Sequence, residues 1–378
     1  MTSSHHSAFR RRQVRLASLI LLCPLSLKVA AAQVATQQAT PESIQRYLNE
    51  AYGQVQESAR ALEQSTAKHC SAASGTGQAA TAAQQTLQRS FESLAMNWSR
   101  VSFIRIGPYR EDHVGQRIQF WPDKRGSGER QIQQALMSQP ETLLQADSLQ
   151  QQSVALQGLP AFEAVLEQLN RPAAMSPDAG KAAFYCNYLG SLADGMVATT
   201  AQLSEHMSEG SEALKALTFS QWMEVIRGGL QISGEMKLGA IEQSMRTQLE
   251  QLGGSTTPER LELTRKVPFS RAHLALASVG AEIHGIDTLL ESAPIKGLLQ
   301  DNEAGYVASI RFQLTQAEQA VKTLAGLEGR AVTAGELEEA IDTVDYASGM
   351  LAQASRDLMT QLYPALGLAR GFNSMDGD

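Results

Sequence analysis

Residues 40–62 read TPESIQRYLNEAYGQVQESARAL, and this stretch sets the character of the whole chain. Thr40 is a favourable N-cap, Pro41 suits the first helical turn, and Glu42 lies where the positive end of a helix favours an acid. The apolar side chains that follow share one stripe at helical spacing: Ile44, Tyr47, Leu48, Tyr52, Val55 and Leu62. Because an amphipathic helix needs a partner to bury such a stripe, we expect a helix packed against other helices.

The rest of the chain continues this pattern. A second helix carries Leu87, Phe91, Leu94, Trp98 and Val101 on one face. Further helices are predicted at about 129–137, 147–170, 178–207, 219–252, 268–292, 303–325 and 334–363. Ala, Leu, Gln and Glu are abundant and aromatic residues make up only 6%, a composition that favours helices over strands. The predicted fold class is therefore all-α.

Two successive groups of about four helices predict two helical bundles, residues 33–210 and 211–378, divided near Ser208–Ser211. Two spacings point to duplication of a four-helix unit. Trp98 and Trp222 each lie on a predicted helix, and Gly158 and Gly280 each open an apolar helical stretch.

The first 32 residues have the form of a secretory signal peptide. Four arginines between residues 10 and 15 precede an apolar run over 16–27, and small residues end the segment at Ala32. The run is shorter than the roughly 20 apolar residues of a membrane span. We expect cleavage after Ala32, export to the periplasm or cell envelope, and no transmembrane span in the mature chain. Lipidation at Cys23 and twin-arginine export are weaker variants of this prediction.

The mature chain is acidic. Removing residues 1–32 takes away five basic and no acidic residues, so 27 basic and 39 acidic residues remain and the net charge becomes −12. This charge argues against nucleic acid as a partner, because its binders need a basic face. It also argues against docking on anionic lipid. Cation binding is compatible with it, although acidity mostly serves solubility.

Two cysteines remain in the mature chain, Cys70 and Cys186. In an oxidising compartment such a pair predicts one disulfide, and two separate buried thiols are the alternative.

Residues 105–130 differ from the helical segments around them. Gly107, Pro108, Gly115, Pro122, Gly126 and Gly128 exclude a long helix here. The stretch is also dense in polar and aromatic chemistry: Arg105, Tyr109, Arg110, Asp112, His113, Arg117, Trp121, Asp123 and Arg125. A structured loop within a helical protein is a place where function concentrates.

This stretch resembles a known family. Ile106-Gly-Pro108, Arg117-Ile-x-Phe-Trp-Pro-Asp123, Arg125-Gly126 and Arg130-Gln131 resemble the central signature of imelysin-like proteins. In that family a Gly-x-His-x-x-Glu motif follows on the next core helix, and here the matching residues are Gly158-Leu-Pro-Ala-Phe-Glu163. The match is specific over about 98–170. The resemblance implies two helical bundles with a shared pocket, a location in the envelope and a link to iron uptake. Some members are classified as metallopeptidases.

Pro160 replaces the histidine of that motif. A zinc or iron site needs several converging ligands, so Glu163 alone cannot fix a metal. The chain has no His-Glu-x-x-His motif and no nucleophile elbow. Glu163 could instead pair with a loop arginine, for which the candidates are Arg117, Arg125 and Arg130. Such a pair would either lock the loop onto the bundle or line a pocket for an anionic or chelated ligand.

The second predicted bundle has one further cluster. His284, Asp287 and Glu291 fall on one helical face, with His273 upstream on nearly the same face, whereas Glu282 points elsewhere. Bundle cores hold carboxylate-histidine metal sites, but acids at this spacing more often form a solvated stripe.

The sequence favours a non-catalytic binding or accessory protein connected with iron or another divalent metal. The predicted ligand pocket comprises Arg117, Trp121, Asp123, Arg125, Gly158 and Glu163. The arginines would capture an anion and Trp121 would form a wall, although core packing is its commoner use. The metal candidates are Glu163, His284 and Asp287, and other envelope proteins are the expected partners. The alternative is an imelysin-type metallopeptidase with a degenerate motif, with Glu163 as ligand or base.

Overall fold

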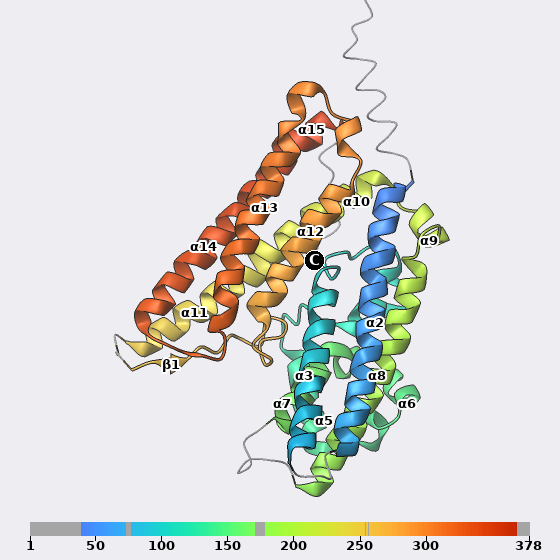
Figure 1. Ribbon diagram of the computed structural model, residues 1–378, viewed down its shortest axis with the longest axis vertical. Helices are drawn as coiled ribbons and strands as arrows, with labels where there is room; N and C mark the ends of the chain where they lie inside the picture. The colour runs from blue at the N-terminus through green and yellow to red at the C-terminus, as the bar shows by residue number, and fades with distance from the viewer. Residues whose placement is uncertain (1–38, 73–76, 171–177, 254, 256, 369–378) are drawn as a thin grey trace, which may run out of the picture.

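The computed structural model describes residues 39–72, 77–170, 178–253, 255 and 257–368, so the predicted signal peptide lies outside the described residues. Within these ranges the fold is all-α, as predicted. Figure 1 shows two groups of packed helices lying side by side. Strands β1 (Glu259–Arg260) and β2 (Ala331–Val332) form one short antiparallel pair.

The first group is built around the long helix α2. α2 (Glu42–Ala72) packs against α3 (Gln78–Ser99) and α8 (Ala179–His206), and α7 (Gly158–Leu169) packs against α8. The predicted stripe of α2 is buried, with Ile44, Leu48 and Leu62 fully inaccessible. Shorter helices complete the group: α4 (Val114–Ile118), α5 (Ser127–Ser138) and α6 (Ala146–Gln150).

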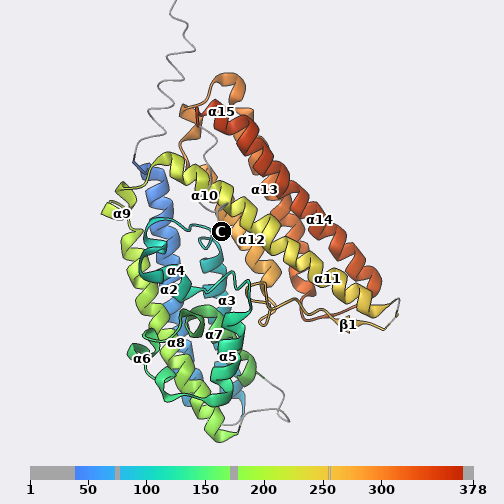
Figure 2. The ribbon, with the colours of Figure 1, turned by 180° about the vertical axis from the view of Figure 1, so that it is seen from behind.

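The second group contains α10 (Phe219–Gln231), α11 (Gly239–Leu252), α12 (Ala275–Ser292), α13 (Gly305–Leu324) and α14 (Ala334–Asp357). The short α9 (Glu212–Lys215) precedes it, and α15 (Tyr363–Ala365) follows α14. A π-helical turn, Ile232–Leu238, joins α10 to α11, and a second one, Leu358–Leu362, joins α14 to α15. Seen from behind, α10 and α11 form one long diagonal across the group (Figure 2).

Two predicted helices differ from the observed ones. The helix predicted over 147–170 is interrupted by a 3₁₀ turn, Val154–Leu156, because Gly158 takes a left-handed conformation with φ +67°. The helix predicted over 268–292 begins only at Ala275, since Phe269 and His273 both have positive φ. His273 therefore lies ahead of α12 and does not share its helical face.

The two groups are joined by a buried polar cluster. The carboxylate of Glu282 on α12 accepts hydrogen bonds from Ser102 of the first group at 2.7 Å and from Ser233 of the π-turn at 2.7 Å. Lys237 Nζ lies 2.6 Å from the same carboxylate. Neither Lys237 nor Glu282 is more than 1% exposed. Burying a charge is costly unless it is paired and hydrogen-bonded, and this cluster meets both conditions.

Glycine allows the helices to approach closely at the same junction. A Cβ on Gly285 of α12 would lie 2.0 Å from the carbonyl oxygen of Arg100, which follows α3. Tyr47 Oη of α2 donates to the carbonyl oxygen of Gly285 at 3.2 Å. The backbone of α12 is thus in contact with the first group without an intervening side chain.

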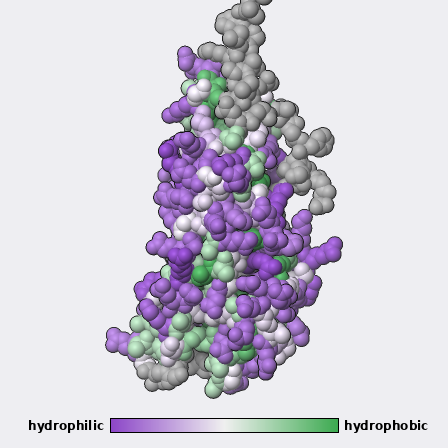
Figure 3. All heavy atoms as spheres, turned by 90° about the vertical axis from the view of Figure 1, so that its right-hand side faces the viewer, coloured by the Kyte–Doolittle hydropathy of each residue, from purple (hydrophilic) through white to green (hydrophobic). Residues whose placement is uncertain are grey.

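The predicted disulfide is confirmed. Cys70 on α2 and Cys186 on α8 are bonded, with their Cα atoms 5.6 Å apart. Among the described residues, no helix combines the length and apolarity that crossing a membrane requires. The face seen in Figure 3 is largely hydrophilic, with apolar side chains scattered over it.

The division into two domains at residue 210 and the duplication stay predictions. Trp98 and Trp222 are both fully buried, which suits equivalent roles. The two glycines differ, because Gly158 takes a left-handed conformation before α7 while Gly280 lies inside α12 in ordinary contact with Val321.

Candidate functional site

Gly158 sets the start of α7. A Cβ at this position would lie 2.2 Å from the carbonyl oxygen of Ile118 and 2.3 Å from that of Arg117. Because glycine alone permits this approach and the positive φ, it fixes the first turn of α7 against the 105–130 loop. Glu163 follows on the same helix, at the side that faces the second group.

Glu163 connects the two groups of helices. Its Oε1 accepts a hydrogen bond from the backbone N–H of Ala272 at 2.9 Å. Ala272 belongs to the 259–274 segment, which runs from β1 to the start of α12. The Glu163 side chain is buried, with 6% of the residue exposed. A carboxylate of the first group therefore holds backbone of the second.

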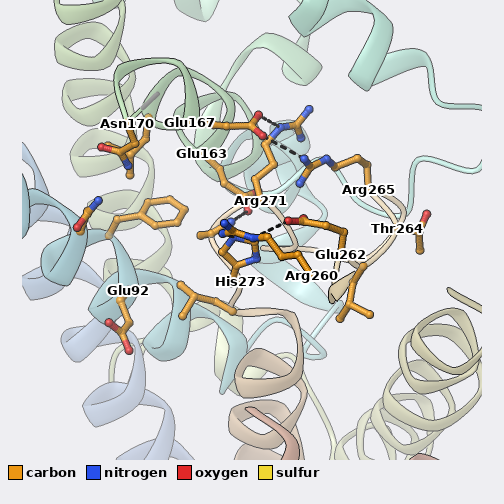
Figure 4. Close-up of a pocket in the computed structure, with 16 residues that line it drawn as sticks. Glu92, Glu163, Glu167, Asn170, Arg260, Glu262, Thr264, Arg265, Arg271 and His273 are labelled. Carbon is orange, nitrogen blue, oxygen red and sulfur yellow. Dashed lines mark hydrogen bonds and ion pairs between the residues drawn. The ribbon is translucent and has the colours of Figure 1, made fainter. Parts of the chain in front are cut away.

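A cavity of about 880 Å³ opens beside Glu163, between α3, α7 and the 259–274 segment. Figure 4 shows side chains of both groups converging on it. Charged and polar residues dominate its lining: Gln88, Glu92, Glu163, Glu167, Asn170, Arg260, Glu262, Thr264, Arg265, Arg271 and His273. Leu166, Leu263 and Leu274 contribute apolar surface.

The guanidinium groups around the cavity are already paired. Glu167 of α7 accepts from Arg265 Nη2 at 3.0 Å and from Arg271 Nε at 2.9 Å. Arg271 also pairs with Glu129 of α5. Within the 259–274 segment, Arg260 Nε lies 2.9 Å from Glu262, and Figure 4 marks this ion pair with a dashed line.

Burial raises the pKa of Glu163 to about 7, although the N–H of Ala272 and the charge of Arg271 act in the opposite direction. Desolvation disfavours the charged form of a carboxyl. The charge of Arg271 does not offset this effect on Glu163, because Arg271 already forms ion pairs with Glu129 and Glu167. Near neutral pH this carboxyl is therefore divided between protonated and ionised forms.

A second buried carboxyl, Glu328, holds the end of the same segment. Its carboxylate accepts hydrogen bonds from two backbone N–H groups in the first turn of α12, that of Ala275 at 3.1 Å and that of Leu276. Burial, with a smaller contribution from the nearby charge of Glu163, raises the pKa of Glu328 to about 7, although the two N–H groups act in the opposite direction. Two proton-binding carboxyls thus flank the strained turn at His273.

A smaller cavity of about 60 Å³ shares Glu163 with the first and is lined by Trp121, Asp123 and Pro160. Trp121 Nε1 donates to the carbonyl oxygen of Lys266 at 2.9 Å. Arg105 and Lys237 lie over the Trp121 ring, 5.1 and 5.3 Å from its centroid. Trp121 therefore packs between the two groups and also lines this smaller cavity.

The remaining predicted pocket residues do not reach the larger cavity. Arg117 Nη1 donates to the carbonyl oxygen of Gln150 at 3.0 Å and to the Gln157 side chain at 3.2 Å. Asp123 caps α5, and its carboxylate accepts from three backbone N–H groups, which lower its pKa although partial burial opposes them. Arg125 is exposed and lines neither cavity.

The proposed pairing of Glu163 with a loop arginine is wrong. Arg117 bonds within the first group, and Arg130 Nη1 donates to the carbonyl oxygen of Arg125 at 2.7 Å. The guanidinium group whose charge acts most strongly on Glu163 is that of Arg271, which comes from the second half of the chain. The loop is held instead by Gly158, Arg117 and the α5 cap.

The second predicted cluster is an ion-pair network. Arg311 of α13 binds both oxygens of Asp287, at 2.8 and 3.0 Å, and both oxygens of Glu291, at 3.0 and 3.1 Å. His284 is exposed, with Nδ1 3.6 Å from Glu318. Across the described residues, no group of three or more His, Cys, Asp or Glu side chains could hold a metal ion.

The arginines of the 259–274 segment line the cavity but were not predicted as site residues. Residues 259–273 read ERLELTRKVPFSRAH, a charged stretch with Pro268 that begins where a predicted helix ends. The 105–130 loop was singled out on the same grounds, so this signal was available. What the sequence does not show is that α7 lies against this stretch.

An all-α fold of two helical groups with a charged cavity between them defines a structural class, and comparison places the chain within it. Residues 48–358 match the family model Imelysin (peptidase M75), and the chain belongs to this family. None of the curated proteins matches the chain.

Solved structures with the same fold include the following two. An imelysin-like protein from Psychrobacter arcticum 273-4 is similar with a TM-score of 0.64 and 20% identity, over 88% of this chain and 99% of that one. A "putative iron-regulated protein A precursor" from Parabacteroides distasonis ATCC 8503 has a TM-score of 0.56 and 12% identity, over 85% and 96% of the two chains. At these identities the likeness concerns the fold.

Proposed function

We propose that this protein is a non-catalytic binding protein of the cell envelope, which captures a metal chelate in connection with the uptake of iron or another metal. The observation that carries this proposal is the cavity of about 880 Å³ between the two helical groups. Small-molecule sites typically occupy about 300–1,000 Å³ and combine apolar walls with a few placed polar groups. The leucines and the charged residues of this cavity provide both.

The donor set favours a chelate over a bare ion. Glu163 is a single carboxyl, Pro160 offers no donor, and Glu167 and Glu262 are bonded to arginines. Iron and zinc need several imidazole, carboxylate or thiolate ligands at one point. A chelate brings its own metal ligands and needs from the protein only shape, charge and hydrogen bonds.

The same residues do not fit the metal centre of a peptidase. With Pro160 in the motif, α7 supplies one carboxyl where a ligand pair would be required, and the described residues around it add no third ligand. We therefore derive no hydrolytic step for this chain.

Location and cargo rest on separate support. The Cys70–Cys186 disulfide suits an oxidising compartment, and the N-terminal pattern predicts export. The similar structure from Parabacteroides distasonis carries a name that refers to iron regulation, which makes iron the first metal to test.

The test is isothermal titration calorimetry of the purified protein, expressed without a histidine tag. The probes are ferrioxamine B, its metal-free chelator, and ferric ion supplied as a nitrilotriacetate complex. We expect the iron-loaded trihydroxamate to bind and ferric ion alone to show no stoichiometric binding.

Variants locate the site. Glu92→Trp, at an exposed residue that lines the cavity, should narrow it and weaken binding. Arg89→Trp, at an exposed position of the same helix outside the cavity lining, is the matched control and should bind normally. Stoichiometric binding of free iron, or peptide hydrolysis that a chelator abolishes, would overturn the proposal.

A further inference from the structure

We propose that the ligand of this cavity is an organic cation, and that it presents an ammonium or guanidinium group to Glu163. The inference deepens the proposed function, because it assigns a charge to the chelate that the cavity binds. It rests on the balance of charges around the cavity and on the one carboxyl that this balance leaves unpaired.

Every guanidinium group at the cavity already has a carboxylate partner. Arg265 and Arg271 hold Glu167, and Arg260 holds Glu262. A guanidinium group can bind a second anion, as Arg271 does with Glu129 and Glu167. An incoming anion would nevertheless lie close to a carboxylate that is already bound, and the repulsion between the two negative charges would offset part of its gain.

Glu163 differs from these arginines in its partners. It accepts hydrogen bonds from backbone N–H groups, but it forms no ion pair with any side chain of the described residues. It is nevertheless 94% buried, and it lines the cavity. The charges of Arg271 and Arg265 act on Glu163 without forming an ion pair with it, so an incoming cation would be the first group to pair with this buried acid directly.

Counting formal charges leads to the same sign. The cavity lining holds three arginines and four glutamates. The arginines pair with Glu167 and Glu262, which leaves the exposed Glu92 and the buried Glu163 without an ion pair among the described residues. His273 adds no positive charge at neutral pH, because burial lowers its pKa and the nearby Arg260 acts in the same direction. A cationic ligand therefore completes the site, while an anionic one increases its imbalance.

The size and walls of the cavity select an organic cation over an inorganic one. A volume of about 880 Å³ far exceeds a single hydrated ion, and Leu166, Leu263 and Leu274 offer apolar surface for an alkyl chain. An inorganic cation would also lack ligands, since no third donor stands near Glu163 in the described part of the chain.

Binding of such a cation releases a proton. With a pKa of about 7, Glu163 is about half protonated at pH 7, and an ammonium group beside it stabilises the ionised form. The charged and titratable groups that face it from the packed elements are Arg265, Arg271, His273, Glu167, Glu262 and Glu328. Of these residues only Arg271 bonds to Glu163, through its backbone N–H and not its side chain, so the released proton is expected to come chiefly from this carboxyl.

The experiment compares two chelates that differ at one group. Ferrioxamine B carries a free terminal ammonium group and a net charge of +1, and its N-acetyl derivative is neutral and otherwise alike. Spermidine serves as a cation without metal. We expect ferrioxamine B to bind at least ten times more tightly than the acetylated chelate. Titration at pH 7 in buffers of different ionisation enthalpy should show net release of protons on binding, because the pKa of Glu163 is about 7 and a neighbouring cation lowers it.

Glu163→Gln keeps the shape and the hydrogen-bond acceptor but removes the charge, so it should reduce the preference for ferrioxamine B to near unity and abolish proton release. Glu57→Gln, the same change at an exposed residue of α2 outside the cavity, is the control. Its preference and proton release should equal those of the unmodified protein.

The outcomes separate the two proposals. Equal binding of both chelates would overturn the cation inference and leave the binding function in place. Binding of spermidine but of neither chelate would support the cation and overturn the chelate. If the Glu163→Gln variant folds and keeps the full preference for ferrioxamine B, or if none of the probes binds, the cation inference is wrong.

Discussion

Replacing Glu163 by glutamine should remove a pH dependence of stability that the structure predicts. In the folded protein the pKa of Glu163 is about 7, against the ordinary value of 4.5. Between these two values the folded state holds a proton that the unfolded state has released. The contribution of Glu163 to stability is therefore greatest below pH 4.5, falls as the pH rises toward 7, and levels off above the folded pKa.

The size of this effect follows from the shift. A difference of 2.5 between 7 and 4.5 corresponds to roughly 3 kcal/mol of unfolding free energy lost between pH 4.5 and pH 8, at about 1.4 kcal/mol per pKa unit. Glu328 adds a loss of the same sign, because its pKa is also raised to about 7 and the charge of Glu163 contributes to that shift. The two losses are coupled, so their sum is an upper bound.

Urea denaturation at pH 5, 6, 7 and 8 and constant ionic strength measures the effect. In Glu163→Gln the slope should fall by about half or more, because the amide cannot ionise and no longer raises the pKa of Glu328. At pH 8 the variant should be at least as stable as the parent. Glu57→Gln, at an exposed carboxylate, should keep the parental slope. A parent protein whose stability is constant or increases from pH 5 to pH 8 would refute the reasoning, and so would an unchanged slope in Glu163→Gln.

Three further changes test other parts of the structure. Gly158→Ala should cost more than about 2 kcal/mol in denaturant unfolding, because a Cβ collides with backbone and φ is positive; a neutral effect would contradict the close approach described. Reducing the bond between Cys70 and Cys186, 116 residues apart, should lower the unfolding free energy by roughly 2–4 kcal/mol, and two free thiols in peptide maps of the purified protein would contradict it. Lys237→Met should cost about 3–5 kcal/mol by leaving a buried carboxylate unpaired, whereas Lys237→Met with Glu282→Leu should recover part of this loss; a double variant less stable than the single one would argue against a paired cluster.

Much of the fold is a local property of the sequence, which is why it was predictable. The stripe that begins at Ile44 and Leu48 determines both that α2 is a helix and which side of it is buried. The breaks at Gly158 and at Phe269–His273 escaped prediction because their apolar neighbours keep a helical pattern through them. Phe269 gives no signal of its positive φ, and His273 gives only a weak one, because histidine enters the left-handed region more readily than most residues.

The candidate site was predictable only in part. Glu163 was found through its motif, and it does line the cavity. Its neighbours were sought in the 105–130 loop, since this loop is near in sequence and rich in arginine. The structure places the 259–274 segment there instead, about 100 residues further along the chain, as the bond from Ala272 shows. Sequence spacing carries no information on such a contact, because it depends on how the two helical groups pack.

The buried acids of this protein also separate into two kinds that no local pattern distinguishes. Helical periodicity joins Asp287 to Glu291 and sets Glu282 apart, yet Glu282 is the fully buried one, since Lys237 from a π-turn supplies its cation. Glu163 is almost as deeply buried, yet no side chain among the described residues forms an ion pair with it. An acid whose charge is matched inside the protein serves the fold, because removing its partner exposes an uncompensated charge. An acid buried at a cavity with its charge unmatched destabilises the fold at neutral pH, and the cation that a ligand brings is what would offset this cost.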